Sequence, residues 1–319
     1  MNGAGRLEHF PISFFALAMG LAGLTIAWEK GGPSLGLTLP VGHYLLGVTA
    51  AAFTVLLVLY ASKALRYGAA VRAEFRHPVK LHFFPTISIS LVLLAIAGLS
   101  LHRPSALVLW VLGSSLHLVF TLYVVNVWIH HSHFEIHHMN PAWFIPVVGN
   151  VLVPIAGVPL GYTEISWLFF SIGIVFWLVL FTIIFNRVLF HHPLPDRLMP
   201  TLFILIAPPA VGFIAYTKLT GGLDPFGRIL YYAALFLTVL LLSQARRFLR
   251  LPFFLSWWAY SFPLAAIAIA TMRMAELTGR TAFDYLSLAF LALLSALIAY
   301  LLYRTSLAIH RRGVCVPEQ

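Results

Sequence analysis

The chain has 319 residues, of which 61% are hydrophobic and only 9% are charged, and its formal net charge is +10. Globular chains usually carry about 25% charged residues, and a soluble domain could not bury this much apolar surface. The composition therefore excludes a soluble protein and indicates an integral membrane protein. The one cysteine, Cys315, excludes a disulfide framework within the chain.

Ten segments are long and apolar enough to cross a bilayer, which takes about 20 mainly apolar residues. The first has only Arg6 upstream and is too long for a cleaved signal peptide, so we expect it to be retained. We expect one all-α transmembrane domain covering 1–319. The predicted span cores are 10–28, 41–63, 81–101, 105–128, 142–160, 163–187, 198–218, 225–245, 253–275 and 283–304.

The positions of Lys and Arg predict the orientation of these spans. An even number of spans places both termini on one side, and that side receives fourteen of the 20 basic residues. Basic residues gather in cytoplasmic loops of membrane proteins. We therefore expect both termini to be cytoplasmic, and this charge distribution explains the positive net charge without a nucleic-acid partner.

The prolines indicate a repeated unit, because the odd-numbered spans contain them and the interiors of the even-numbered spans do not. Five hairpins, each with one kinked and one straight helix, explain this pattern and would pack as a quasi-five-fold ring. Kinked helices are tolerated in a membrane where they line a cavity. The alternative is that membrane helices are simply rich in proline. The prolines concerned are Pro11, Pro85, Pro146, Pro154, Pro208, Pro209 and Pro263.

The odd-numbered spans carry almost no charge, which limits what a central pore could transport. Arg273 and Glu276 lie only at the far end of the ninth span. Coupled carriers usually place charged or strongly coordinating groups near the midplane, whereas a passive conduit needs only weak binding and a suitable bore. Basic residues at the cytoplasmic mouth would concentrate anions. The pattern favours a passive anion pathway.

Phe262 precedes Pro263 near the middle of the ninth span, in the sequence LSWWAYSFPLAAIAIATM. A large apolar ring at the narrowest point of a dry bore blocks ions sterically and by excluding water. Packing between helices is the alternative role for this side chain, and spacing alone does not separate the two.

Three motifs, WWAYSFP (257–263), RAEFRHPVK (72–80) and NPAWFIPVVGN (140–150), resemble the tellurite-resistance/dicarboxylate transporter family. This family includes bacterial TehA proteins and the slow-type anion channels of plant guard cells. The resemblance implies a homotrimer in the bacterial inner membrane, with a pore in each protomer for small monovalent anions. It also implies that Phe262 occludes this pore in the ninth helix.

The resemblance leaves other functions open, because the family also includes malate carriers and sulfite exporters. A secondary transporter of dicarboxylate, sulfite or tellurite-related oxyanions is therefore the alternative function. In the first span, Ala16 and Ala18 stand where the family often has Gly and Pro, so a milder kink is expected there. The segment 72–80 is most simply a solvated basic loop. Its position also suggests a cytoplasmic mouth formed by Arg72, Arg76 and Lys80.

A histidine-rich segment, HHSHFEIHH (130–138), raises the alternatives of a metal site, a pH sensor or a solvated connector. Membrane di-iron enzymes need several such boxes, and the remaining histidines show no regular spacing. We therefore expect no enzyme, no metal and no other cofactor. In the fourth span, His117 and Asn126 are expected to make interhelical hydrogen bonds. The sensor candidates are His130, His131, His133, His137 and His138.

Overall fold

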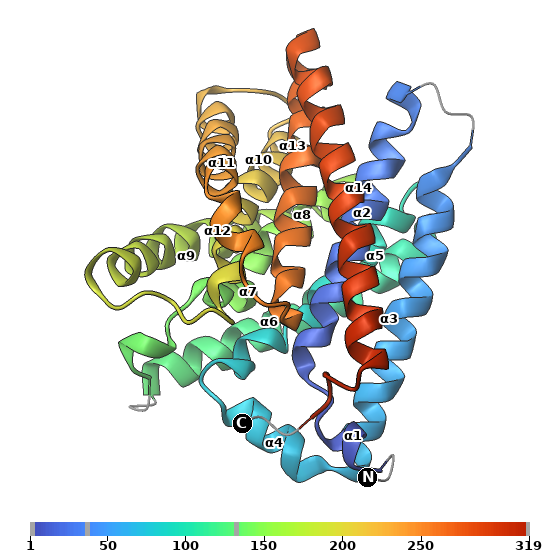
Figure 1. Ribbon diagram of the computed structural model, residues 1–319. Coiled ribbons are helices and arrows are strands. Elements are labelled where there is room, and N and C mark those ends of the chain that lie inside the picture. The colour runs from blue at the N-terminus through green and yellow to red at the C-terminus, as the bar shows by residue number, and fades with distance from the viewer. Residues whose placement is uncertain (1–3, 36–38, 131–133, 317–319) are drawn as a thin grey trace.

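The computed structural model describes residues 4–35, 39–130 and 134–316, and these residues form helices without strands (Figure 1). Within these described ranges, ten helical segments are long and apolar enough to span a membrane, which confirms the predicted number. Each predicted core agrees with an observed span to within six residues at either end. The spans are Ile12–Gly31, Val41–Arg66, Lys80–Gly98, Arg103–His130, Pro141–Leu160, Thr163–Phe190, Met199–Leu219, Pro225–Ser243, Leu255–Thr278 and Thr281–His310.

The odd-numbered spans form an inner set and the even-numbered spans an outer set. In the most apolar part of each odd-numbered span 72–83% of the residues are buried, against 22–39% in the even-numbered spans. The outer helices therefore present apolar faces to the surroundings, as expected for contact with lipid. These outer helices are α3 (Val41–Arg66), α6 (Arg103–His130), α9 (Thr163–Phe190), α11 (Pro225–Ser243) and α14 (Thr281–His310).

The inner helices contact one another in a closed cycle. Helix α2 (Phe15–Gly31) packs on α5 (Thr86–Gly98), α5 on α8 (Val153–Leu160), and α8 on α10 (Ala207–Leu219). Helix α10 then packs on α13 (Ser261–Thr278), and α13 returns to α2. Each of these helices also packs on the outer helix that follows it in the chain, so the ten spans form five hairpins.

The inner spans combine a 3₁₀ segment with an α-helix, and most of their prolines lie where one changes into the other. Pro85 precedes α5, while Pro154, Pro208 and Pro209 lie in the first turns of α8 and α10. Pro263 is the third residue of α13 and follows the 3₁₀ helix Leu255–Tyr260. A proline nitrogen has no hydrogen to donate, so the first turn of a helix is where it costs least.

The fifth span is the most irregular, as its prolines and glycines predicted. It consists of α7 (Phe144–Val148), which contains Pro146, a 3₁₀ turn at Gly149–Leu152, and α8. Neighbouring side chains bind the carbonyls near this break. Thr121 Oγ1 donates to the carbonyl of Pro146 at 2.7 Å, and Trp110 Nε1 donates to that of Val153 at 2.9 Å. The outer helix α6 thus stabilises the broken inner span.

Two short helices, α1 (Ala4–Glu8) and α4 (Gly68–Arg76), lie at the end of the molecule where both chain termini are found (Figure 1). A third short helix, α12 (Ala245–Leu249), follows α11. The expectation of a solvated loop at 72–80 was wrong for its first half, because residues 72–76 belong to α4. Arg72 and Arg76 are exposed, but Glu74 is buried against Lys63 of α3. A carboxylate can be buried there because a cation pairs with it.

Candidate functional site

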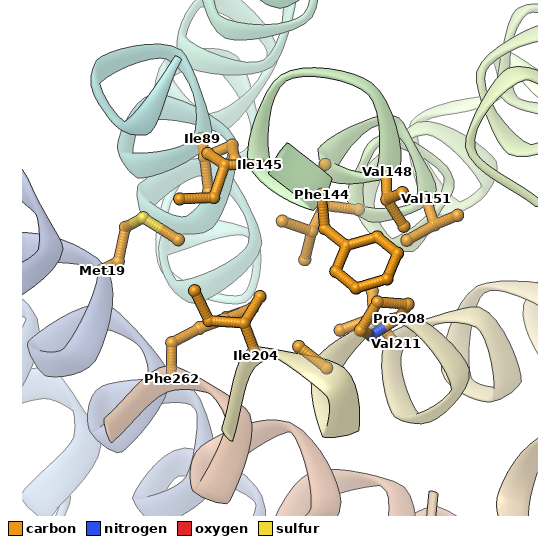
Figure 2. A pocket seen from close by; sticks show the side chains of 13 residues that line it. Met19, Ile89, Phe144, Ile145, Val148, Val151, Ile204, Pro208, Val211 and Phe262 are labelled. Atoms are coloured by element: carbon orange, nitrogen blue, oxygen red, sulfur yellow. The ribbon is translucent and has the colours of Figure 1, made fainter. Parts of the chain in front are cut away.

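A small apolar cavity, here called the central cavity, lies where the five inner spans converge. It encloses about 50 Å³. Figure 2 shows Met19, Ile89, Phe144, Ile204 and Phe262, one from each inner span in chain order, around the same space. The full lining is Met19, Ile89, Phe144, Ile145, Val148, Gly149, Val151, Leu152, Ile204, Ala207, Pro208, Val211 and Phe262.

A second apolar cavity, the distal cavity, lies farther from the termini and encloses about 20 Å³. Three residues line both the central and the distal cavity: Leu152, Val211 and Phe262. Phe262 has the largest side chain of the three. The remaining lining of the distal cavity is Ile26, Lys30, Leu93, Ile96, Ile155, Ile214, Ala266 and Ile269.

A third and larger cavity, the proximal cavity, lies at the end nearest the termini and measures about 360 Å³. Its basic side chains are His77, Lys80 and Arg197. The three cavities follow one another along the spans. The first inner span lines the proximal cavity at Ser13, the central cavity at Met19 and the distal cavity at Lys30.

Phe262 is held by its neighbours on α13 and by the close approach of α2. Ser261 Oγ donates to the carbonyl of Trp258 at 2.6 Å, which fixes the turn just before the ring. On the facing helix, a Cβ at Gly23 would lie 2.7 Å from Ala265 Cβ and 3.5 Å from Phe262 Cδ2. Glycine at position 23 therefore lets the two backbones approach at the level of Phe262. The ring is half-buried, because one face borders the cavities.

A polar network lies behind the wall of the central cavity without entering it. Ser88 Oγ lies 2.9 Å from His117 Nδ1, and Asn150 Nδ2 donates to Thr121 Oγ1 at 2.9 Å. The interhelical bond expected of His117 is confirmed. The same expectation was wrong for Asn126, whose side chain is exposed and makes no hydrogen bond within the described part of the chain. The cavity wall itself is apolar, so an ion there would meet no charged side chain.

The predicted basic mouth is only partly assembled around the proximal cavity. Lys80 lines this cavity, whereas Arg72 and Arg76 project from the exposed face of α4 and do not line it. Arg197, which precedes the seventh span, lines it instead. The sequence placed Arg197 on the correct face but contained no signal that singled it out. Ser256 also lines the cavity, and its buried hydroxyl has no partner among the described residues.

The described residues of the histidine segment, His130 and 134–138, are exposed or half-buried at the surface. His130 Nδ1 lies 2.9 Å from the carbonyl of Asn126, and exposed His137 pairs with Glu135 at 3.1 Å. The rings of His137 and His138 lie side by side with 4.0 Å between their centroids and an angle of 50° between their planes. His131 and His133 lie outside the described residues. Within the described ranges, no three potential metal-binding side chains gather at one point.

Comparison with known proteins gives matches along almost the whole chain. Residues 9–306 match the family model described as a voltage-dependent anion channel (SLAC1). An S-type anion channel of Arabidopsis thaliana, SLAH2, is 31% identical over 86% of this chain and 54% of its own length. The tellurite resistance protein TehA homolog of Haemophilus influenzae is 31% identical over 81% of this chain and 79% of its own. The chain thus spans about half the length of the plant relative.

Proposed function

Since the chain belongs to the voltage-dependent anion channel family, we propose that it is a passive channel for small monovalent anions such as chloride and nitrate. The family comprises channels and transporters and is not a class of enzymes. In this proposal the anion passes between the five inner spans, through the proximal, central and distal cavities in turn. Phe262 closes the route between the central and the distal cavity.

The observation that carries this proposal is the position of Phe262. Its ring lines both narrow cavities, and each of the five inner spans contributes to the central one. One water molecule needs about 10–15 Å³ of cavity volume, so cavities of about 50 and 20 Å³ hold at most a few waters and leave no room for an ion with its full hydration shell. The structure is therefore interpreted as the closed state, and moving or removing the ring would join the two cavities.

The charge distribution supports a conduit rather than a tight binding site. The charged residues of the inner spans, such as Lys30, Lys80 and Arg273, lie toward the ends of these spans. An ion in the central part of the route would be held only weakly, which permits fast exit. A dicarboxylate site would instead require paired cations at the centre.

The test is the ionic current of Phe262→Ala and wild-type protein in planar bilayers with chloride or nitrate. Lowering a steric barrier by about 3 kcal/mol raises the transit rate about a hundredfold, so a large increase is expected. Phe236→Ala is the matched control, because Phe236 is 66% exposed on the outer helix α11. Equally small currents in all three proteins would overturn the proposal.

The alternative function is secondary transport of a dicarboxylate, sulfite or a tellurite-related oxyanion, and the TehA homolog among the relatives favours it. A carrier predicts saturable uptake of labelled malate or sulfite by proteoliposomes, together with negligible current. The same preparations can be used for both measurements, so the two functions are separable.

The proposal also includes a homotrimer in the bacterial inner membrane with both termini cytoplasmic. The apolar faces of the outer helices support the membrane location, and the excess of basic residues on the terminal side supports the orientation. The homotrimer rests on the resemblance to the family. The mass of the detergent-solubilised protein measures the oligomeric state. Protease access to a tag at either terminus, in sealed vesicles of known sidedness, measures the orientation.

A further inference from the structure

Three basic side chains gather at the end of the inner spans that lies opposite the termini. Lys30 lies at the end of α2, Lys218 at the end of α10 and Arg273 in the last turns of α13. All three are half-buried. Arg273 Nε donates to Thr217 Oγ1, next to Lys218, at 3.5 Å. Lys218 and Arg273 each lie about one helical turn beyond a residue that lines the distal cavity, Ile214 on α10 and Ile269 on α13. Lys30 also lines the distal cavity, whose wall is apolar, so its aliphatic stem faces that space.

The nearby carboxylates pair with neither lysine of this cluster, and Glu276 offsets the charge of Arg273 only. Glu276 pairs with Arg273, with 3.0 Å between Oε2 and Nη1. Glu29 accepts a hydrogen bond from Ser100 instead of pairing with its neighbour Lys30. Among residues 4–35, 39–130 and 134–316, neither the Lys30 nor the Lys218 ammonium group has a hydrogen-bond or ion-pair partner.

An excess of positive charge in a half-buried cluster destabilises the protein unless an anion balances it. Like charges about 5 Å apart repel one another even in water, and more strongly where protein excludes water. The lysines of this cluster come from different spans, so the fold brings them together at one place. That place borders the distal cavity, directly beyond Phe262.

We propose that Lys30, Lys218 and Arg273 form a binding site for a small inorganic monovalent anion at the distal mouth of the route. The two ammonium groups act as point charges without the fixed fork of a guanidinium, which suits a spherical or small planar anion. The role assigned to this site, loading the pore from the distal side, rests on the proposed function, whereas occupancy by an anion does not.

Bromide is the probe for occupancy, because its anomalous scattering locates it in crystals. Wild-type crystals soaked in bromide should show a peak within contact distance of Lys30 and Lys218. Crystals of the Lys30→Gln/Lys218→Gln variant should lack this peak. Wild-type crystals without a peak there would overturn the proposal. Thermal unfolding of both proteins in bromide and in gluconate checks that the variant folds, and only the wild type should gain stability from bromide.

Conductance tests the role in loading, in the Phe262→Ala background. Removing one positive charge about 5 Å from the anion lowers its local concentration about three- to fourfold. Current carried by anions entering from the distal side should fall by this factor in Lys30→Gln or Lys218→Gln at about 0.01 M salt, and much less at 1 M. Arg228→Gln and Arg280→Gln are matched controls, since these exposed arginines lie on the same face on or beside outer helices.

These experiments distinguish failure of the channel proposal from failure of the anion-site proposal. If Phe262→Ala does not conduct while bromide occupies the site, the channel proposal fails and the anion site stands. If Phe262→Ala conducts and neither lysine variant differs from the arginine controls, the loading role is overturned.

Discussion

Replacement of Glu74 by glutamine tests how the terminal end of the fold is held together. Lys63 Nζ lies 3.0 Å from Glu74 Oε2 and 2.8 Å from the carbonyl of Phe10. Tyr60 OH donates to the same Glu74 oxygen at 2.8 Å. Lys63 is 1% exposed and Glu74 is 8% exposed. The cluster thus joins α3, α4 and the segment before the first span.

Glu74→Gln keeps an acceptor for Tyr60 but removes the charge opposite Lys63. A buried ammonium group left without its counter-charge costs about 3–5 kcal/mol. We expect a loss of about 3 kcal/mol, the lower end, because the amide oxygen of glutamine and the Phe10 carbonyl still accept from Lys63. At about 2 °C per kcal/mol, the unfolding midpoint in detergent should fall by about 6 °C.

Lys63→Met in the Glu74→Gln background removes the uncompensated cation and should recover most of this loss, to within about 1 kcal/mol of the wild type. Glu135→Gln is the control, because Glu135 pairs with a histidine on the surface and its side chain is 69% exposed. Its midpoint should change by less than the error. The reasoning is refuted if Glu74→Gln is as stable as the wild type, or if the double variant is no more stable than the single one.

Two further predictions concern the broken span and a helix cap. Thr121→Val removes the hydroxyl that donates to the carbonyl of buried Pro146, and the free energy of unfolding should fall by about 1–3 kcal/mol, measured by thermal unfolding. Thr182→Val is the control because Thr182 is exposed. An equal loss of stability in this control would contradict the explanation. The backbone N–H of Gly227 donates to Asp224, the cap of α11, and lowers the pKa of that carboxylate. The stabilisation by the ionised Asp224 carboxylate is therefore present above the ordinary pKa of aspartate and is lost as the pH falls below about 4. Asp224→Asn cannot ionise at this position, so thermal unfolding should show a smaller loss of stability in acid for this variant than for the wild type.

The number and order of the spans could be predicted because apolar length and flanking charge are local properties. The alternating prolines also predicted which spans are inner. The 3₁₀ segments that precede most inner α-helices were not predicted, and the break in the fifth span could not be placed because a donor from another helix binds a carbonyl there. Thr121 of α6, for example, binds the Pro146 carbonyl 25 residues away.

The candidate site was predictable only where one residue stands out in its own segment. Phe262 stands out because it precedes a proline in the middle of a span, but spacing alone left packing as an alternative, and its role as a gate was implied by the family resemblance. Leu152 and Val211, which share the wall with it, are ordinary apolar residues whose register around the cavities is set by packing. The same limit applies to Lys30 and Lys218, which are 188 positions apart in sequence and meet only in the folded chain. Burial of Glu74 was missed because the basic residues around it suggested a solvated segment.

The closed cycle of inner helices has a consequence for how the protein is made. Helix α2 is among the first segments to leave the ribosome, yet one of its two inner neighbours, α13, is among the last. Through most of translation α2 lacks a partner along the side that later packs on α13, and the glycines on that side face lipid or the insertion machinery. The cycle of inner helices can therefore close only late, after the fifth hairpin has been inserted. A nascent chain released before that hairpin is made keeps a gap between α2 and α10.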